Sequence, residues 1–269
     1  MVIHMFKQKT AVITGAASGI GRALAVELAA AGARLALSDV DEAGLAETAR
    51  LCRAETEVRT YPLDVSQREA VFAHADRVLQ DFGAAHFLFN NAGVTLVGTV
   101  EHTDIDEFEW LLSINLWGVI YGTKAFLPAM LRQREGHIVN ISSIFGFVAY
   151  PAQGAYNVSK FGVRAFTECL WGELEGTGVR AVSVHPGGIR TNIERAGQRC
   201  RAITDENDGL HEKAELMLRT PPAHVARDIL RGLRKGRRRI VTGYGSTRLY
   251  WLSRLAPNRY GGLMRRFGF

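Results

Sequence analysis

Residues 9–39 read KTAVITGAASGIGRALAVELAAAGARLALSD, and this stretch decides the fold. A short apolar run, Lys9–Thr14, leads into a glycine-rich turn, which an amphipathic stretch follows. The order strand, glycine turn and helix is typical of the opening of a nucleotide-binding βαβ unit. Gly15, Gly19 and Gly21 form the pattern T-G-x-x-x-G-x-G. Such glycines let the backbone approach a pyrophosphate at a helix N-terminus, although an ordinary strand–helix connection is the alternative.

The second apolar run, RLALSD, ends in an acid, Asp39. A carboxylate at the end of the second strand accepts hydrogen bonds from the adenosine ribose of NAD and repels the extra phosphate of NADP. Ala17, Ser18 and Val40 supply no cation that would hold this phosphate. The sequence therefore predicts that NAD(H) is preferred over NADP(H). The alternative is that Asp39 only caps a helix that begins near Asp41.

Strands and helices continue to alternate along the chain. Further strands are expected at Val58–Leu63, His86–Asn91, His137–Ser142, Val179–His185 and 238–243, and helices at Gln67–Phe82, Asp104–Trp117, Val119–Arg132, Ala155–Glu175 and Ala223–Lys235. This alternation predicts an α/β fold, a Rossmann-like doubly wound parallel sheet with helices on both faces. No repeat, linker or composition break precedes residue 190, so we expect a single domain over residues 1–269.

The composition is that of an ordinary globular protein, with 47% hydrophobic and 22% charged residues. No window of eighteen apolar residues indicates a membrane span, and the first ten residues are too polar for a signal peptide. Cys52, Cys169 and Cys200 are scattered without His or Cys neighbours. Their spacing argues against a disulfide framework or a metal site and favours a reducing, cytoplasmic location.

A second informative stretch, Ile141–Phe161, reads ISSIFGFVAYPAQGAYNVSKF. If a helix begins near Tyr156, the spacing of four places Tyr156 and Lys160 on one face. An adjacent ammonium lowers the pKa of a phenol, which is otherwise about 10 and too high for proton transfer near neutrality. The pair is interpreted as a general acid/base, with Ser143 arriving from the preceding strand to share the substrate oxygen. An exposed lysine stem packed on a tyrosine ring is the alternative.

The joint order of these motifs resembles the classical-type short-chain dehydrogenase/reductase family over roughly residues 7–195. The resemblance rests on Thr14-Gly15-x-x-x-Gly19-x-Gly21, Asn90-Asn91-Ala92-Gly93, Asn115, Ser143, Tyr156-x-x-x-Lys160 and Pro186-Gly187. It implies that Tyr156 is the general acid/base, and that Lys160 lowers its pKa and hydrogen-bonds the nicotinamide ribose. It further implies that Ser143 orients the substrate oxygen and that Asn115 holds a water of a proton relay.

The same resemblance implies a set of cofactor contacts. The pyrophosphate is expected to contact the glycine loop, with Gly15, Ser18, Gly19, Ile20 and Gly21. The ribose is expected at Asp39, the adenine at Asp64 and Val65, and the adenosine side at Asn91, Ala92 and Gly93. The rest of the dinucleotide is expected to contact Tyr156, Lys160, Pro186, Gly187, Ile189 and Thr191.

Substrate identity is expected to lie in two variable segments. The loop Ile144–Tyr150 is apolar and aromatic, which suggests a bulky hydrophobic alcohol or ketone held by Ser143, Phe145 and Tyr156. Simple packing of Phe145 and Phe147 is the alternative. Residues 190–220 are polar with one amphipathic piece and are interpreted as a lid over the substrate.

The chain ends in a basic amphipathic extension, residues 244–269. No Asp or Glu follows Asp228, whereas 11 of the 33 Lys and Arg residues do. The extension is interpreted either as a peripheral contact with an anionic membrane or an acidic acyl carrier, or as a helix packed on the domain. Nucleic-acid binding is not expected, since no reading motif is present.

These features predict an NAD(H)-dependent oxidoreductase that interconverts a hydrophobic secondary alcohol and its ketone. The alternatives are a ketoacyl-thioester reductase that docks an acidic carrier, and a non-catalytic dinucleotide-binding regulatory protein. A homodimer or homotetramer is expected, because residues 104–132 and 155–175 resemble the interface helices of the family. Aromatic anchors for such an interface are offered by Trp110, Trp117, Phe126 and Trp171.

Overall fold

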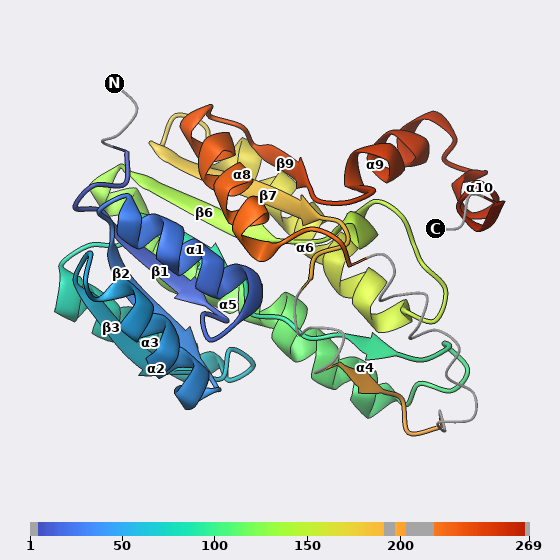
Figure 1. The fold of residues 1–269 in the computed structure, drawn as a ribbon, viewed down its shortest axis with the longest axis horizontal. Helices are drawn as coiled ribbons and strands as arrows, with labels where there is room; N and C mark the ends of the chain where they lie inside the picture. The colour runs from blue at the N-terminus through green and yellow to red at the C-terminus, as the bar shows by residue number, and fades with distance from the viewer. Residues whose placement is uncertain (1–4, 191–196, 203–217, 267–269) are drawn as a thin grey trace.

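The computed structural model describes residues 5–190, 197–202 and 218–266. Its centre is a parallel sheet of seven strands in the order β3-β2-β1-β4-β6-β7-β9 (Figure 1). The strands are β1 (Thr10–Thr14), β2 (Arg34–Asp39), β3 (Val58–Pro62), β4 (Phe87–Asn90), β6 (Gly136–Ile141), β7 (Val179–Pro186) and β9 (Arg239–Thr242). The doubly wound fold expected from the sequence is confirmed.

Helices cover both faces of the sheet. They are α1 (Gly19–Ala30), α2 (Glu42–Cys52), α3 (Arg68–Phe82), α4 (Ile105–Leu112), α5 (Gly118–Gln133), α6 (Gly154–Glu173) and α8 (Pro222–Arg234). Figure 1 shows α1 and α8 side by side over the near face. On β1, Ala11 and Ile13 join the core beneath α1 and α8, whereas Val12 joins the core beneath α3, α5 and α6. A strand buried on both faces needs this continuous apolar run.

From β1 the sheet extends through β2 to β3 on one side, and from β4 it extends through β6 and β7 to β9 on the other side. Ligands of open α/β sheets bind at the carboxyl ends of the strands where this reversal occurs. Here the reversal lies between the glycine turn after β1 and the Asn91–Gly93 turn after β4. The topology therefore places both predicted cofactor motifs at one point.

One long element differs from its prediction. The helices expected at Asp104–Trp117 and Val119–Arg132 form a continuous rod, in which α4 and α5 are joined by a π-helical turn, Ser113–Trp117. The prediction that Phe126 is an interface anchor is wrong. Its side chain is 1% exposed and packs in the core beneath the sheet, because its face of α5 is turned toward β4 and β6.

The C-terminal extension packs on the domain. Strand β9 completes the sheet beside β7, and helices α9 (Ser246–Leu255) and α10 (Tyr260–Arg266) follow it. Leu249 and Met264 are buried against the apolar loop that contains Ile144, Phe147 and Val148. Within the described residues, every helix is too short or too polar to cross a bilayer.

Candidate active site

A cleft of about 420 Å³ opens at the carboxyl ends of the strands. Among the residues expected at the cofactor, fifteen line it: Gly15, Ser18, Gly19, Ile20, Asp39, Asp64, Val65, Asn91, Ala92, Gly93, Tyr156, Lys160, Pro186, Gly187 and Ile189. The cleft also takes in Ser143 and Phe145, the other two expected substrate contacts. Gly21 and Asn115 stand behind its wall, and Thr191 lies outside the described residues. The structure thus brings together residues that the sequence spreads over 175 positions.

The glycine turn is tight because other backbone segments press on it. Gly15 has a φ of +65°, and a Cβ there would stand 2.7 Å from the Cα of Ala92. Gly21 is needed for a different reason, since its Cβ would stand 2.0 Å from the carbonyl oxygen of Gly15. Ser18 at the start of α1 makes no side-chain capping hydrogen bond. The first NH groups of α1 therefore face the cleft as donors for an anion.

Asp39 is held in place by two backbone donors. Its carboxylate accepts hydrogen bonds from the NH of Ala17 at 2.8 Å and from the NH of Asp41 at 3.1 Å. The cap of α2 is Asp41, which accepts from the NH of Gly44 at 2.9 Å. The alternative that Asp39 serves as this cap is therefore wrong, and Asp39 faces the cleft.

A cation that the sequence reasoning overlooked, Arg22, lies close to this acid. Its Nε donates to the Thr48 hydroxyl at 2.9 Å, and its guanidinium donates to the carbonyls of Ala17 and Gly44. Three acceptors therefore occupy Arg22, one on the glycine loop and two on α2. Its place directly after Gly21 is the signal that could have drawn attention to it.

Tyr156 and Lys160 stand one turn apart at the start of α6. The Nζ of Lys160 lies 5.4 Å from the centre of the Tyr156 ring and donates to the carbonyl of Ile141 at 3.1 Å. Lys160 is 3% exposed, and this burial lowers its pKa from 10.5 to about 8. Most Lys160 side chains therefore still carry their charge at pH 7. The alternative of an exposed lysine stem is wrong.

Ser143 stands at the end of β6 and begins the apolar loop. It is 8% exposed, and its Oγ accepts from the NH of Phe145 at 3.1 Å. The Phe145 ring lines the cleft edge-on to Tyr156, with 6.2 Å between ring centres. Phe147 is instead packed, 6% exposed and 4.1 Å from the His185 ring. Of the two aromatic residues, only Phe145 belongs to the cleft.

Asn115 lies in the π-helical turn and is completely buried. Its Oδ1 accepts from the NH of Val94, and its Nδ2 donates to the Val94 carbonyl, both at 2.8 Å. The side chain thus pairs with a backbone segment as a neighbouring strand would. A Cβ on Gly93 would stand 3.2 Å from Oδ1 of Asn115 and 3.5 Å from Nζ of Lys160. Asn115 therefore fixes a segment that passes beside Lys160.

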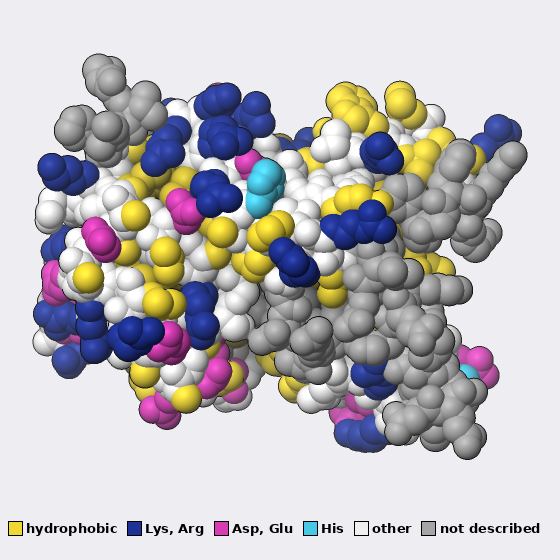
Figure 2. All heavy atoms as spheres, viewed as in Figure 1, with side chains coloured by type: hydrophobic (Ala, Val, Ile, Leu, Met, Phe, Trp, Pro, Cys, Tyr) yellow, Lys and Arg dark blue, Asp and Glu magenta, His cyan; other side chains and the backbone are white. Residues whose placement is uncertain are grey.

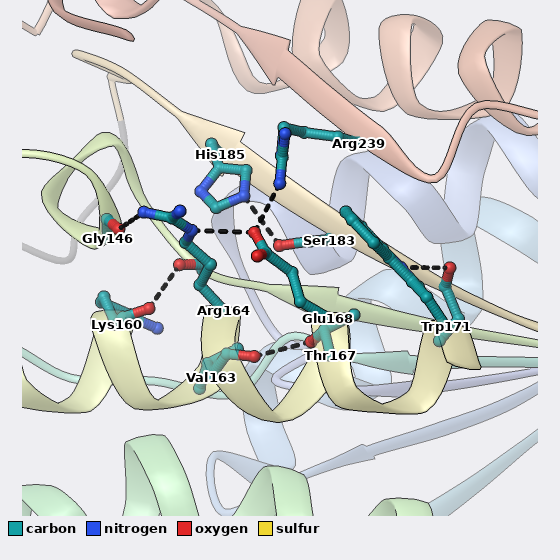
Figure 3. A network of polar contacts seen from close by, with 12 residues as sticks. Gly146, Lys160, Val163, Arg164, Thr167, Glu168, Trp171, Ser183, His185 and Arg239 are labelled. Carbon is teal, nitrogen blue, oxygen red and sulfur yellow. Dashed lines mark hydrogen bonds and ion pairs between the residues drawn. The ribbon is translucent and has the colours of Figure 1, made fainter. Parts of the chain in front are cut away.

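A polar network that the sequence did not reveal supports the Ser143 loop (Figure 3). Nδ1 of His185 lies 2.9 Å from the Ser143 carbonyl, and Nε2 lies 2.7 Å from Oγ of Ser183. A carbonyl only accepts, so the ring hydrogen is on Nδ1 and the Ser183 hydroxyl donates to Nε2. Burial lowers the pKa of His185 to about 3, which keeps the ring neutral.

Three charged residues continue this network. Arg164 donates to the Gly146 carbonyl at 3.1 Å and to Glu168 at 2.8 Å, and Arg239 of β9 donates to the same carboxylate. The Arg164 guanidinium also covers the Phe147 ring at 4.4 Å. The loop after Ser143 is therefore fastened to α6, β7 and β9. The i, i+4 spacing of Arg164 and Glu168 is the only part of this arrangement visible in the sequence.

The outer part of the cleft is formed by segments from the last third of the chain. Within the expected lid, Gln198–Arg199 forms strand β8 and pairs in parallel with β5, Leu96–Val97. Gly197 and Leu218 also line the cleft, while residues 191–196 and 203–217 lie outside the described residues. Tyr244 and Leu249 close the cleft from the C-terminal extension, a contribution that the sequence reasoning missed.

Comparison with known proteins places this arrangement among related chains. Residues 9–200 match the family model described as short chain dehydrogenase. A putative oxidoreductase, SadH, of Mycobacterium tuberculosis is 44% identical over 266 residues, covering 96% of this chain and 95% of the relative.

Two solved structures share the fold. One is a short chain dehydrogenase/reductase from Burkholderia phymatum in complex with NAD; it is 36% identical, with a TM-score of 0.83 over 87% of this chain and 89% of the other. The other is an alcohol dehydrogenase from the archaeon Thermococcus sibiricus complexed with 5-hydroxy-NADP; it is 29% identical, with a TM-score of 0.72 over 84% and 90%. Each of these two neighbours was solved with a nicotinamide dinucleotide. The chain belongs to the short-chain dehydrogenase/reductase family, whose members are oxidoreductases acting on CH–OH groups.

Proposed function

We propose that this protein interconverts a hydrophobic secondary alcohol and its ketone, with NAD(H) as cofactor and Tyr156 as general acid/base. The observation that carries the proposal is the buried Lys160, whose ammonium lies 5.4 Å from the centre of the Tyr156 ring at the floor of the cleft. A positive charge at this distance favours the phenolate and lowers the pKa of the phenol toward neutrality.

The residues of the cleft fit a dinucleotide. Gly15 allows a tight turn at which a Cβ would collide with the backbone of Ala92, and the NH groups at the start of α1 suit a pyrophosphate. The nicotinamide, when bound, supplies the acceptor or donor of hydride. Tyr156 removes or returns the hydroxyl proton, and Ser143 donates from Oγ to the substrate oxygen while its own Oγ accepts from Phe145. Asn115 holds the Val94 segment beside Lys160 and would orient a relay water there.

The preference for NAD(H) rests on Asp39 and its surroundings. Its carboxylate is fixed by the NH groups of Ala17 and Asp41 and remains open to the cleft. The nearby cation, Arg22, already donates to Thr48 and to two carbonyls. A 2′-phosphate would therefore meet a fixed negative charge, whereas ribose hydroxyls would find acceptors.

The substrate class follows from the walls of the cleft. Side chains opposite the glycine turn are largely apolar or aromatic: Val94, Val97, Ile144, Phe145, Tyr150, Leu218, Tyr244 and Leu249. Such walls favour a bulky hydrophobic alcohol or ketone, because polar groups would lose their hydration there. Residues 190–220, whose described part contributes β8, would act as the lid.

A homodimer or homotetramer is supported by the outer side of α6. The exposed positions Val158, Phe161, Ala165 and Cys169 follow each other at helical spacing, and none carries a charge. Trp117, at the end of the neighbouring π-helical turn, is 49% exposed. An uncharged stripe of this length on two adjoining helices suits a self-complementary contact.

The test is Tyr156→Phe, assayed by NADH absorbance on a panel of steroids, aromatic alcohols, aliphatic ketones and acyl thioesters. Turnover is expected to fall by at least about a thousandfold while NADH binding stays within a few-fold of wild type, because only the proton donor is lost. Tyr121→Phe removes a phenol hydroxyl outside the cleft and serves as the matched control. Activity of Tyr156→Phe near the wild-type level would exclude the mechanism.

The same panel separates the alternatives. A ketoacyl-thioester reductase would prefer acyl thioesters, and more strongly when they are linked to an acidic carrier. A non-catalytic regulatory binder would take up NADH yet turn over nothing. The buried Lys160 beside Tyr156 argues against the second alternative, since dinucleotide binding alone does not require a desolvated ammonium at that place.

A further inference from the structure

Helix α9 has two apolar faces, only one of which is covered. Leu249 is 3% exposed and lies in the cluster formed with Ile144 and Phe147. On the other side, Trp251 is 54% exposed and Leu255 is 80% exposed. These two side chains stand one helical turn apart and form a protruding ridge. Figure 2 shows hydrophobic side chains gathered in this region of the molecule.

The ridge is bordered by arginines. Arg248, Arg254 and Arg259 are all exposed, on α9 and on the turn that follows it. No acidic residue occurs anywhere after Asp228, so this part of the chain holds no internal counter-charge in its own sequence. We call Tyr244, Arg248, Trp251, Arg254, Leu255 and Arg259 the C-terminal patch.

We propose that the C-terminal patch docks on the surface of an anionic lipid bilayer, with α9 lying in the plane of the interface. A helix with an apolar ridge flanked by arginines has the composition of interfacial helices. Tryptophan suits the boundary between lipid headgroups and acyl chains, and arginines are attracted by acidic headgroups. Docking needs only the patch and does not depend on the proposed reaction.

Two other occupants fit the patch less well. A second copy of the chain would form a symmetric contact, which would bring the same arginines against one another without an acid between them. An acidic carrier protein would match the charge, but it would need a pocket shaped for the protruding Trp251 and Leu255. A fluid bilayer accepts such a ridge without a matching pocket.

The docked face would also be next to the substrate. Tyr244, at the edge of the patch, and Leu249, on the inner face of α9, both line the cleft. A single helix therefore separates the lipid surface from the site. Given the proposed function, a hydrophobic alcohol dissolved in the bilayer would enter the cleft along α9 without crossing water.

The experiment is sedimentation of the full chain with vesicles of phosphatidylcholine, with and without phosphatidylglycerol. Binding is expected with the anionic vesicles, and raised salt should weaken it. Arg248→Gln/Arg254→Gln should weaken it by about fivefold for each arginine removed. Trp251→Ser/Leu255→Ser should abolish it. The control is Arg237→Gln/Arg238→Gln, which removes the same charge just before β9, at the end of that strand opposite to α9.

A second measurement reports on the location of the ridge. Emission of Trp251, taken as the difference between wild type and Trp251→Phe, should shift to the blue on anionic vesicles and be quenched by brominated lipid. Equal binding by all the arginine variants, or no change in Trp251 emission, would overturn the proposal. So would capture by an acidic acyl carrier without vesicle binding. Retained NADH binding shows that each variant is folded, and turnover of a water-soluble ketone tests the reaction separately.

Discussion

Replacing Lys160 by methionine should remove catalysis and yet stabilise the cofactor-free protein at neutral pH. The folded state holds this ammonium at 3% exposure, and burial lowers its pKa from 10.5 to about 8. A difference of this size corresponds to a penalty of about 3 kcal/mol for keeping the group charged in the folded protein. Methionine fills a similar volume without a charge, but it leaves the Ile141 carbonyl without its Nζ donor, at a cost of about 1 kcal/mol. The expected net gain is about 2 kcal/mol at pH 7.

The sign of the pH dependence follows from the same values. Because the folded pKa is lower than the unfolded one, the unfolded chain binds more protons between about pH 8 and 10.5. The penalty is therefore complete below pH 8 and disappears as the pH rises to 10.5. At about pH 9.5 roughly 1 kcal/mol of it remains, which is close to the cost of the lost hydrogen bond, so the advantage of Lys160→Met should fall to near zero.

The measurement is urea unfolding of cofactor-free wild type and Lys160→Met at pH 7 and at about pH 9.5. Lys124→Met, at an exposed position on α5, is the control and should change the free energy of unfolding by less than about 0.5 kcal/mol at either pH. A variant that is less stable than wild type at pH 7, or a difference that does not depend on pH, would refute the reasoning. NADH binding should weaken in the variant, since the expected ribose contact is lost.

Three further changes test other parts of the site. Asp39→Ala should weaken NADH binding by about tenfold and reduce the ratio of kcat/KM for NADH over NADPH, because two ribose hydrogen bonds are lost. A wild-type enzyme that prefers NADPH tenfold would contradict this. Gly15→Ala, at a φ of +65°, should abolish NADH binding in calorimetry, whereas Gly172→Ala, with open space around its Cβ, should leave it unchanged. Glu168→Gln removes the shared partner of Arg164 and Arg239 and should lower kcat by about tenfold or more with an unchanged Kd for NADH; an unchanged kcat would show that the network does not position the serine.

Much of the fold could be predicted because local patterns and topology agree in this chain. The glycine turn, the acid after the second strand and the alternation of apolar strands with amphipathic helices all indicate the same parallel sheet. The edge at which Asp39, Ser143 and Tyr156 meet follows from that sheet without further information. These residues are found at the cleft because each stands at a strand end or at the first turn of a helix.

The remainder of the site depends on contacts between distant segments. His185 and Arg239 reach the Ser143 loop only because β6, β7 and β9 are neighbours, and their side chains carry no local signature. The sequence could not show whether Phe126 is buried or exposed, because the aromatic residues of the α4–α5 rod occur on several of its sides. The role of Tyr244 and Leu249 as cleft walls depends on the fold-back of α9, which amphipathic spacing alone does not fix.

The fastening of the Ser143 loop has a consequence for engineering new specificity. Ile144–Tyr150 looks like a peptide that could be exchanged between relatives, since it forms much of the substrate wall. The Gly146 carbonyl and the Phe147 ring, however, are held by Arg164 and His185, which lie outside the exchanged segment, and His185 also holds the Ser143 carbonyl just before it. A graft of Ile144–Tyr150 alone would lack the residues that hold this loop in its native position. Ser143 would then be displaced together with the loop. A change of substrate specificity should therefore exchange the loop together with Arg164 and His185.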